Sequence, residues 1–447
     1  MGRENGVRSG RLWARLLGVE KTTVERVEFD EATQRLVAHV RPHERERRRC
    51  PRCWKRCRFY DRGEGRRRWR ALDLGTLIAE LESDAPRISC PDHGVLVAAV
   101  PWARHHAGHT RFFDDQVAWL AVQTSKTAVT RLMRIAWLTV GAIIARVVAD
   151  IDATVDRLDG LRRIGIDEVS FKKGQRYLTV VIDHDQRRLV WAAEGRNQAV
   201  VSAFFDALGQ ERTALLTHVS ADGAEWIADV VTARAPEAIR CADAFHVVAW
   251  ATEALDVVRR QALADARALA RTEPKGRPGR CRKDGTQASP PRPGKERVKA
   301  LTRARFVLWK NPENLTSSQR AKLEWIAATD PELHRAYLLK EGLRAVFAIG
   351  HQEGPDAGVE ALDRWLAWAA RSRIPSFVEL GRKIRQRHRP QIEAAIRENL
   401  SNALVESTNT KIRLITRVAF GFHSAEAVIA LAMLNLGGYR PDLPGRT

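Results

Sequence analysis

The amino-acid sequence predicts a multidomain α+β protein with a β-rich N-terminal module, a helical segment and a mixed α/β core. The chain has 447 residues, which is more than one ordinary hydrophobic core accommodates. An apolar fraction of 44% is sufficient to build packed cores. Residues 24–40 and 161–195 have the polarity pattern of strands, whereas residues 112–150 and 298–398 have helical spacing.

The first 95 residues predict a small β-rich module. Residues 24–40 alternate polar and apolar side chains around a turn, which is typical of a β-hairpin. Residues 72–93 predict a second strand pair that ends in Cys-Pro-Asp-His. An arginine-dense segment, residues 43–70, lies between the two and contains the first cysteines.

Four residues of this module have the spacing of a zinc site. Cys50-x2-Cys53 and Cys90-x2-His93 form two short pairs, and two such pairs near turns can close one tetrahedron. Cys57 is a spare thiol that could compete as a ligand. The alternative is that these are isolated thiols in a loop. Six cysteines, unevenly spread, argue against a disulfide framework, so we expect a structural Zn²⁺ that supports folding and not catalysis.

Residues 112–150 predict two short amphipathic helices with a break at about 134–137. This is the outline of a helix-turn-helix, although a packed helical hairpin has the same spacing. In a helix-turn-helix the second helix, near Trp137–Arg146, would enter the major groove of DNA. That helix is unusually apolar for one that contacts bases.

From residue 161 the pattern predicts a mixed sheet with helices on its faces, because three consecutive strands are followed by α/β alternation. The predicted elements are strands at 161–170, 176–185 and 187–195, a helix at 198–209, a strand at 213–222, a helix at 223–234, a strand at 238–243 and a long helix from Phe245.

The remaining chain is predicted to be mostly helical. Residues 271–297 are rich in Pro, Gly and basic residues, which is typical of an exposed, disordered loop. Residues 298–398 are helical, and residues 400–436 form a last helix-rich block. We expect four tryptophans of this part at core positions: Trp309, Trp325, Trp365 and Trp368.

The formal net charge of +21 indicates a polyanionic partner. Nucleic acid fits best, because each neutralised phosphate releases condensed counterions. A membrane surface is a weaker alternative. The simplest alternative is that the charge reflects only an arginine-rich composition and no polyanionic partner. The N-terminus has no pattern of a cleaved leader, and no apolar run reaches the roughly 18 residues that span a bilayer, so we expect no membrane partner.

Three acidic residues are candidate ligands of divalent metal ions. Asp167 lies at the end of the first predicted strand of this sheet, Asp222 follows the fourth, and Glu406 lies at the start of a predicted helix. Carboxylates brought together repel one another, and hard divalent cations relieve that repulsion through oxygen ligation. A pair of such ions can cleave a phosphodiester. The alternative is that each residue merely caps a turn or a helix.

A second acidic pattern is Asp243-Ala-Phe-His246. An Asp and a His three residues apart lie on one face of a helical turn. They could orient the metal ligands through hydrogen bonds without binding the metal themselves. Alternatively, Asp243 is an N-cap and His246 a core histidine.

Two groups of basic residues are candidate DNA contacts. Aromatic residues interleave the arginine-dense segment, an arrangement that suits phosphate contact. A solvated basic face is the alternative there. The second group follows Glu406 at helical spacing and could clamp the cleaved backbone. The candidates are Arg66, Arg67 and Arg68 in the first group and Lys411, Arg413 and Arg417 in the second.

Several ordered motifs resemble the ISL-three family of bacterial insertion-sequence transposases, which belong to the DDE class and have an RNase H-like core. The resemblance covers nearly the whole chain, and its last motif is the most specific. The motifs are CPRC at 50–53, RRWRALDLG at 67–75, CPDHGVLVAAVPWA at 90–103, GIDEVSFKKGQRYLTVVID at 165–183, CADAFHVV at 241–248, AYLLKEGLR at 336–344 and NALVESTNTKIRLITRVAFGFHSAEAVI at 402–429.

The resemblance implies that Asp167, a second Asp and Glu406 form a catalytic triad that binds Mg²⁺, with Mn²⁺ as a substitute. We favour Asp222 as the second Asp, and Asp243 is the alternative because related transposases keep a D-x-x-H motif near the site. The family usually has a second Cys-x2-Cys pair, whereas this chain has His93 in place of its last cysteine.

The resemblance also implies a domain organisation, in which a helical insertion interrupts the core. The expected domains are a zinc-binding β-rich module at 1–105, a helix-turn-helix region at 106–158, the first part of the RNase H-like core at 159–262, a helical insertion at 263–395 with its disordered loop at 271–297, and the C-terminal core helices at 396–447.

The function implied is DNA transposition in the bacterial cytoplasm, at the nucleoid. The N-terminal half would bind terminal inverted repeats, and the core would cut double-stranded DNA and join it to target DNA. We expect a homodimer or a larger assembly, because two element ends must be joined in one event. The alternatives are a transposase-derived DNA-binding protein without catalysis and a nuclease without strand transfer.

Overall fold

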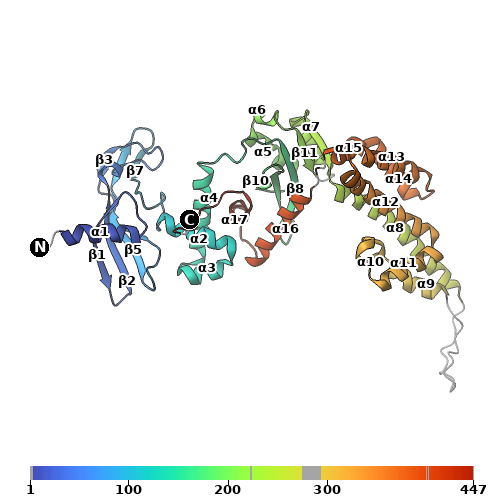
Figure 1. Cartoon of the computed structure of the whole chain (residues 1–447), viewed down its shortest axis with the longest axis horizontal. Coiled ribbons are helices and arrows are strands. Elements are labelled where there is room, and N and C mark those ends of the chain that lie inside the picture. Colours follow the sequence, from blue (N-terminus) through green and yellow to red (C-terminus); the bar gives the residue numbers. More distant parts are fainter. Residues whose placement is uncertain (1–3, 222–223, 274–292, 399, 401, 446–447) are drawn as a thin grey trace, which may run out of the picture. The chain divides into compact units, whose positions relative to one another are not determined.

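The computed structural model describes residues 4–221, 224–273, 293–398, 400 and 402–445. The chain forms two compact units. Unit 1 consists of residues 1–157 and 414–447, and unit 2 consists of residues 158–413. In Figure 1, unit 1 contains the blue and cyan elements together with α17, and unit 2 contains the green to orange elements.

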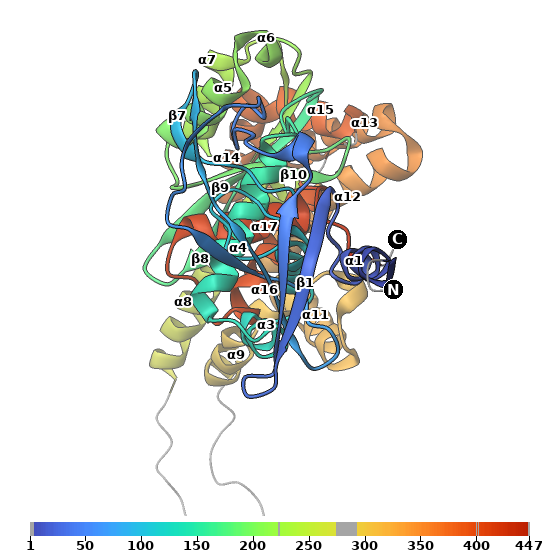
Figure 2. The same ribbon diagram turned by 90° about the vertical axis from the view of Figure 1, so that its left-hand side faces the viewer.

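The N-terminal part of unit 1 is β-rich, as predicted, and begins with a helix that the sequence analysis missed. That helix is α1 (Glu4–Leu16). The predicted hairpin is confirmed as β1 (Thr22–Asp30) and β2 (Arg35–Pro42), the long pair visible in Figure 2. The further elements are η1 (Glu44–Glu46), β3 (Arg58–Asp61), β4 (Arg66–Arg70), β5 (Ile78–Asp84), β6 (Arg87–Cys90) and β7 (Gly94–Val97).

These strands form two sheets, with the orders β1-β2-β5-β4 and β3-β6-β7. The predicted strand pair at 72–93 is therefore wrong in its pairing. Its two strands, β5 and β6, belong to different sheets, because β5 pairs with β2 and β4 while β6 pairs with β3 and β7. Alternate residues of β5 are buried, and Leu81 packs in the same core as Trp69 and Trp102.

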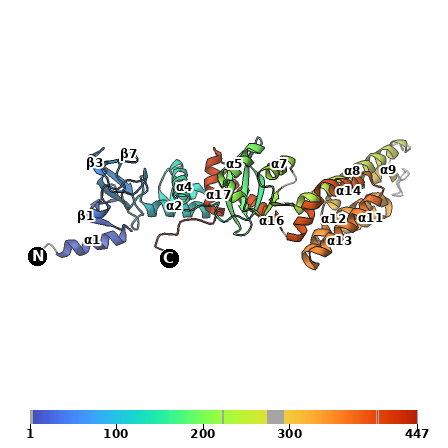
Figure 3. The same ribbon diagram turned by 90° about the horizontal axis from the view of Figure 1, so that it is seen from above.

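The helix-turn-helix outline is confirmed, with one additional helix before it. The helices are α2 (Arg111–Gln123), α3 (Lys126–Met133) and α4 (Trp137–Asp152). Thr110 and Ser125 cap α2 and α3, and Arg134 ends α3 in the left-handed conformation, at φ 54°. In the same unit, α17 (Ala425–Leu436) packs against α4 and α2, as Figure 3 shows.

Unit 2 contains one five-stranded mixed sheet in the order β10-β9-β8-β11-β12, visible in green in Figure 1. The first three strands are antiparallel neighbours, and β11 and β12 run parallel to β8. This is the RNase H-like arrangement that the sequence implied. The strands are β8 (Arg163–Lys172), β9 (Arg176–Asp183), β10 (Arg188–Glu194), β11 (His218–Ala221) and β12 (Ile239–Ala242).

Helices pack on this sheet and continue into a helical region. Phe204, Phe205 and Ile227 from two of these helices share a core with Ile164 and Ile166 of β8. The helices that follow or connect the strands are α5 (Gln198–Leu208), α6 (Gln210–Thr213), α7 (Glu225–Arg234) and α8 (Ala244–Thr272). The helix that carries Glu406 is α16 (Ala403–Val418).

The helical region between α8 and α16 has its own core, which includes Leu255, Leu339 and Leu362. Trp365 is buried as predicted, but Trp309 and Trp368 are exposed by 48% and 36%, which corrects the expectation for these two. The elements are α9 (Pro293–Thr302), α10 (Arg305–Leu308), η2 (Pro312–Asn314), α11 (Ser317–Thr329), α12 (Pro331–Glu353), α13 (Pro355–Arg371), α14 (Pro375–Lys383), the π-helix η3 (Ile384–His388) and α15 (Arg389–Glu398).

The predicted loop at 271–297 falls mostly outside the described residues, which end at Glu273 and resume at Pro293. Among the described residues, no single helix is both long and apolar enough to cross a bilayer; α3 and α4 pass that test only together, and they meet at 100°.

Candidate functional site

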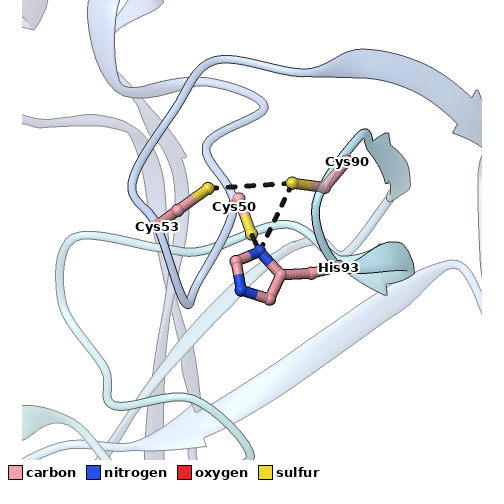
Figure 4. Close-up of side chains that lie close together, drawn as sticks. All are labelled: Cys50, Cys53, Cys90 and His93. Carbon is pink, nitrogen blue, oxygen red and sulfur yellow. Dashed lines mark hydrogen bonds between the residues drawn. The ribbon is translucent and has the colours of Figure 1, made fainter.

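The four predicted zinc ligands converge in unit 1. The ligand atoms of Cys50, Cys53, Cys90 and His93 all lie within 4.8 Å of one another. Figure 4 shows them facing a common centre, with Sγ of Cys53 3.7 Å from Sγ of Cys90 and Nδ1 of His93 3.5 Å from Sγ of Cys90. Tetrahedral Zn–S bonds of about 2.3 Å place two sulfurs about 3.8 Å apart. The donor set and its spacing therefore fit Zn²⁺.

The fourth thiol of this region, Cys57, is not part of the group. Cys57 donates to the backbone oxygen of Lys55 at 3.4 Å, and burial raises its pKa to about 11. Burial also acts to raise the pKa of Cys90, but hydrogen bonds from His93 and the backbone of Asp92 outweigh it and lower that pKa to about 6. The thiolate form that binds zinc is thus favoured at Cys90 and disfavoured at Cys57.

Asp167 lies within β8 and not at its end, since the strand continues to Lys172. The pairing of β8 with β11 stops at Ile166, so Asp167 is the first residue of β8 beyond that ladder. Both carboxylate oxygens accept hydrogen bonds. The backbone N–H of Glu168 donates to Oδ1 at 2.7 Å, and Nδ2 of Asn409 donates to Oδ2 at 2.8 Å.

Glu406 lies in the first turn of α16, as predicted. Its pKa is raised, first by burial and then by the negative charge of Asp243, whereas His246 and Arg413 act to lower it. Asn409 follows Glu406 by three residues, which places both side chains on the same face of α16. Because Asn409 contacts Asp167, that face lies against β8.

Asp243 is the N-cap that one of the two alternatives predicted, whereas His246 is partly exposed and is not a core histidine. Asp243 caps α8, since its Oδ1 accepts from the backbone N–H of Phe245 at 3.3 Å. Its Oδ2 lies 2.6 Å from Nδ1 of His246. Asp243 is buried, and its charge contributes to the raised pKa of Glu406, so the pair borders the acidic site.

A buried polar chain, which the sequence analysis missed, joins the start of α16 to the sheet. The hydroxyl of Ser220 on β11 donates to Oδ1 of Asn402 at 2.6 Å. Nε2 of His184, just after β9, lies 2.8 Å from the same hydroxyl. Burial lowers the pKa of His184 to about 4. The only available signal was position: Asn402 and Asn409 flank Glu406 by four and three residues.

The oxygen donors around Asp167 suit hard divalent cations. Carboxylates of Asp167, Glu406 and Asp243 are the ligand type that Mg²⁺ and Mn²⁺ prefer. The pKa of Glu406 is raised first by burial and then by the negative charge of Asp243, and a cation would offset that charge. Asp222 lies outside the described residues. Among the described residues, the zinc ligands are the one group of three or more acidic, Cys or His side chains whose ligand atoms lie within 4.8 Å.

The two groups of predicted DNA contacts differ in their surroundings. Arg66 and Arg68 form ion pairs with Glu82 at 3.1 and 2.7 Å, and Arg67 donates to the backbone oxygen of Ala107 at 2.8 Å. The basic residues that follow Glu406 are exposed on α16: Lys411, Arg413 and Arg417. A DNA contact stays a prediction for both groups.

The predicted second helix of the helix-turn-helix exposes small and apolar side chains. Leu138 is 78% exposed, and Ala142 and Ala145 lie on the same exposed face. Arg146 of this helix instead pairs with the fully buried Asp114 at 2.9 Å. The absence of an exposed cation among these residues matches the apolar character noted in the sequence.

Three family models match consecutive parts of the chain. The model of the DDE transposase of ISL3 elements, described as a transposase, matches residues 164–432. The helix-turn-helix domain of transposase family ISL3 matches residues 98–148. The zinc finger of the transposases of IS204, IS1001, IS1096 and IS1165 matches residues 46–93.

Known proteins of similar sequence carry the same description. The chain is 61% identical over 448 residues to the transposase for insertion sequence element IS1557 of Mycobacterium tuberculosis, in two strains, with 98% of each chain covered. It is 25% identical over 408 residues to the transposase for IS1001 of Bordetella parapertussis, with 90% of this chain and 92% of the relative covered.

Proposed function

The chain belongs to the ISL3 family of insertion-sequence transposases, and from that premise we propose that it cuts DNA at the ends of its element and joins those ends to target DNA. The proposed catalytic ligands are Asp167, Asp222 and Glu406. The observation that carries this proposal is the hydrogen bond from Asn409 to Asp167, because it brings the face of α16 that bears Glu406 onto the strand that bears Asp167.

The second aspartate is argued from the sheet register. Ala221 ends β11 and pairs with Ile166 of β8. In the sequence Asp222 directly follows Ala221, as Asp167 directly follows Ile166. In the sequence, each aspartate therefore directly follows one member of the pair that joins these neighbouring parallel strands. Asp243 follows β12, the next strand along the sheet, and already binds His246 and caps α8, so we assign it an orienting role.

Two Mg²⁺ or Mn²⁺ ions held by these carboxylates would activate the attacking oxygen and stabilise the leaving oxygen of the phosphodiester. Hydrogen bonds from the backbone N–H of Glu168 and from Nδ2 of Asn409 hold the carboxylate of Asp167 in place. Water then attacks the phosphorus at the element end, and the bond to the 3′-oxygen breaks. The freed 3′-hydroxyl attacks a target phosphodiester in line and displaces its 3′-oxygen.

The chain's own basic residues would position the DNA for these steps. Lys411 and Arg413 are exposed on the helix of Glu406, within two turns of it, and can neutralise phosphates beside the cut. The zinc module and the helix-turn-helix of unit 1 would bind the terminal inverted repeats, consistent with their family matches. Two copies would act together, since two ends must be joined.

The direct test is a cleavage and joining assay with purified full-length protein and DNA that carries the element ends. We expect nicked and joined products only with Mg²⁺ or Mn²⁺, and none from Asp167→Ala. DNA binding without cleavage in either metal would contradict the proposal and favour a binding protein. Cleavage without joined products would favour a nuclease.

A further inference from the structure

Two buried asparagines flank Glu406, Asn402 just before α16 and Asn409 within it, and each reaches a different strand of the sheet. We propose that Asn402 and Asn409 are positioning residues that lock the Glu406 helix onto the sheet and so set the arrangement of Asp167 and Glu406. The inference rests on the proposed function, because it concerns how this chain holds the carboxylates that would share the metal ions.

Asn409 holds the first catalytic aspartate directly. It is 2% exposed, and its Nδ2 donates to Oδ2 of Asp167 at 2.8 Å. The backbone N–H of Glu168 donates to the other oxygen. These two donors, one on each oxygen, hold the carboxylate plane of Asp167 in place. Oδ1 of Asn409 is buried without a partner among the described residues, so Nδ2 makes the one hydrogen bond that holds this side chain.

Asn402 anchors the start of the helix through a relay of two further side chains. Its Oδ1 accepts the hydroxyl proton of Ser220. Because that proton is committed, the Ser220 oxygen must accept from Nε2–H of His184, which fixes the tautomer of this neutral imidazole. The backbone oxygen of Asn402 in turn accepts from the N–H of Glu406 at 2.8 Å. Strands β9 and β11 are thus connected to the backbone of Glu406.

Gly165 allows the helix to approach the sheet this closely. A Cβ at this position would lie 2.6 Å from Cγ2 of Val405 and 2.8 Å from Nε2 of His184. Both distances are shorter than any normal contact, so a side chain here would displace α16, His184 or both. Val405 directly precedes Glu406, and Gly165 lies two residues before Asp167. The contact is therefore adjacent to both proposed ligands.

The residue spacing lets the hydrogen bonds of Asn402 and Asn409 hold the same face of the helix. Asn402, Glu406 and Asn409 follow one another at four and three residues, so they share one face of the helix. Hydrogen bonds at both ends of that face restrain rotation and sliding of α16 relative to β8. Residues that orient metal ligands are worth about 10–100-fold in metal affinity or activity when they are removed.

The test measures Mn²⁺ binding to the full chain by electron paramagnetic resonance, without DNA cleavage as a readout. We expect Asn409→Leu and Asn402→Leu each to weaken the Mn²⁺ affinity by roughly 10–100-fold. Thr408→Val is the matched control, because Thr408 is a buried polar residue of the same helix whose hydroxyl, among the described residues, donates to the backbone oxygen of Leu404 in its own helix. Its Mn²⁺ affinity should equal that of the wild type.

Unchanged Mn²⁺ affinity in Asn409→Leu would overturn the inference, and so would an equal loss in Thr408→Val. If Asn402→Leu does not fold, Ser220→Ala removes the same hydrogen bond and should give the same loss. The proposed function fails separately, if the wild type shows no Mn²⁺ site that Asp167→Ala abolishes. Melting curves without metal check that each variant is folded.

Discussion

The zinc cluster of unit 1 and the acidic site of unit 2 differ in the length of chain that separates their ligands. The zinc ligands come from two short turns, 37 to 43 residues apart. The acidic site brings Asp167 to a helix 242 residues further along the chain. Local turns preassemble the first site, whereas the second depends on the whole topology of the sheet and on the side chains that dock α16.

The difference also concerns charge. Thiols and an imidazole can approach closely in neutral forms, and the four zinc ligands lie within 4.8 Å of one another. Carboxylates repel one another, and the pKa of Glu406 is raised first by burial and then by the negative charge of Asp243. The comparison teaches that the zinc ligands converge through local turns, whereas the acidic ligands depend on hydrogen bonds from distant parts of the chain and would need cations to offset their repulsion.

The largest effect is expected at the zinc cluster. Cys90→Ser should release the metal and unfold residues 46–97, because structural zinc contributes about 10–16 kcal/mol to such modules. Zinc content per chain and limited proteolysis measure the loss. Cys57→Ser is the control and should keep its zinc, since Cys57 donates to Lys55 instead. Equal zinc loss in both variants would show that the ligand set is wrong.

The next largest effect is expected on the rate of DNA strand cleavage, without loss of bound zinc. Asp167→Asn and Asp222→Asn should each reduce the rate of strand cleavage by about 10³-fold or more, since a metal pair supplies several kcal/mol to the transition state. Single-turnover cleavage of end-containing DNA measures the rate. Zinc content and melting temperature should match the wild type.

Asp243→Asn tests whether Asp222 or Asp243 is the second catalytic aspartate. We expect a smaller loss of about 10–100-fold, because Asp243 orients His246 and caps α8 in our account. A loss equal to that of Asp167→Asn, with full activity in Asp222→Asn, would exchange the roles of the two aspartates.

A smaller effect concerns stability in acid, and it should separate the two units. The pKa of His184 is lowered from 6.5 to about 4 by burial, so the unfolded chain binds its proton more readily. Stability of unit 2 is therefore complete above pH 6.5 and falls as the pH drops towards 4, by about 2 kcal/mol at pH 5. His184→Gln should show a smaller loss of melting temperature between pH 7.5 and 5.

His109 provides the comparison in unit 1, because burial also lowers its pKa to about 4. His184→Gln should leave the acid sensitivity of unit 1 unchanged, as followed by hydrogen exchange of each unit. An unchanged acid sensitivity of unit 2 would contradict the role of His184.

The smallest effect distinguishes the two basic groups. Lys411→Ala and Arg413→Ala should each reduce the salt dependence of DNA binding by about one counterion, because these side chains are exposed. Arg66→Ala and Arg68→Ala should reduce it less, since Glu82 already pairs with both. Binding isotherms at several salt concentrations give the slopes, and the reverse order would refute this ranking.

The sequence predicted what depends on short-range patterns. The hairpin β1–β2, the helices α3 and α4 and the alternation of β8–β12 followed from residue spacing, and so did the four zinc ligands. The pairing of β5 was not predictable, because either neighbouring strand satisfies its alternation. The exposure of Trp309 depends on how distant helices pack, which spacing along one helix does not report.

The acidic site was predicted only in part. Asp167 and Glu406 were found from strand and helix signals, with the family resemblance adding their roles. Asn402 and Asn409 were not, because an asparagine in a helix has no spacing rule that assigns it a partner on a strand. The hydrogen bonds of Ser220 and His184 were likewise not predictable, because they form only where β9, β11 and α16 lie side by side.

The central claim is that Asp167 and Glu406 share bound divalent cations, and Fe²⁺-directed cleavage of the protein backbone tests it most directly. With Fe²⁺ in place of Mg²⁺, locally generated hydroxyl radicals should cut the wild-type chain in β8 near residue 167 and in α16 near residue 406. Asp167→Ala should abolish both cuts together, and excess Mg²⁺ should compete with them. Cuts at one of these segments alone, or cuts that survive Asp167→Ala, would contradict the account.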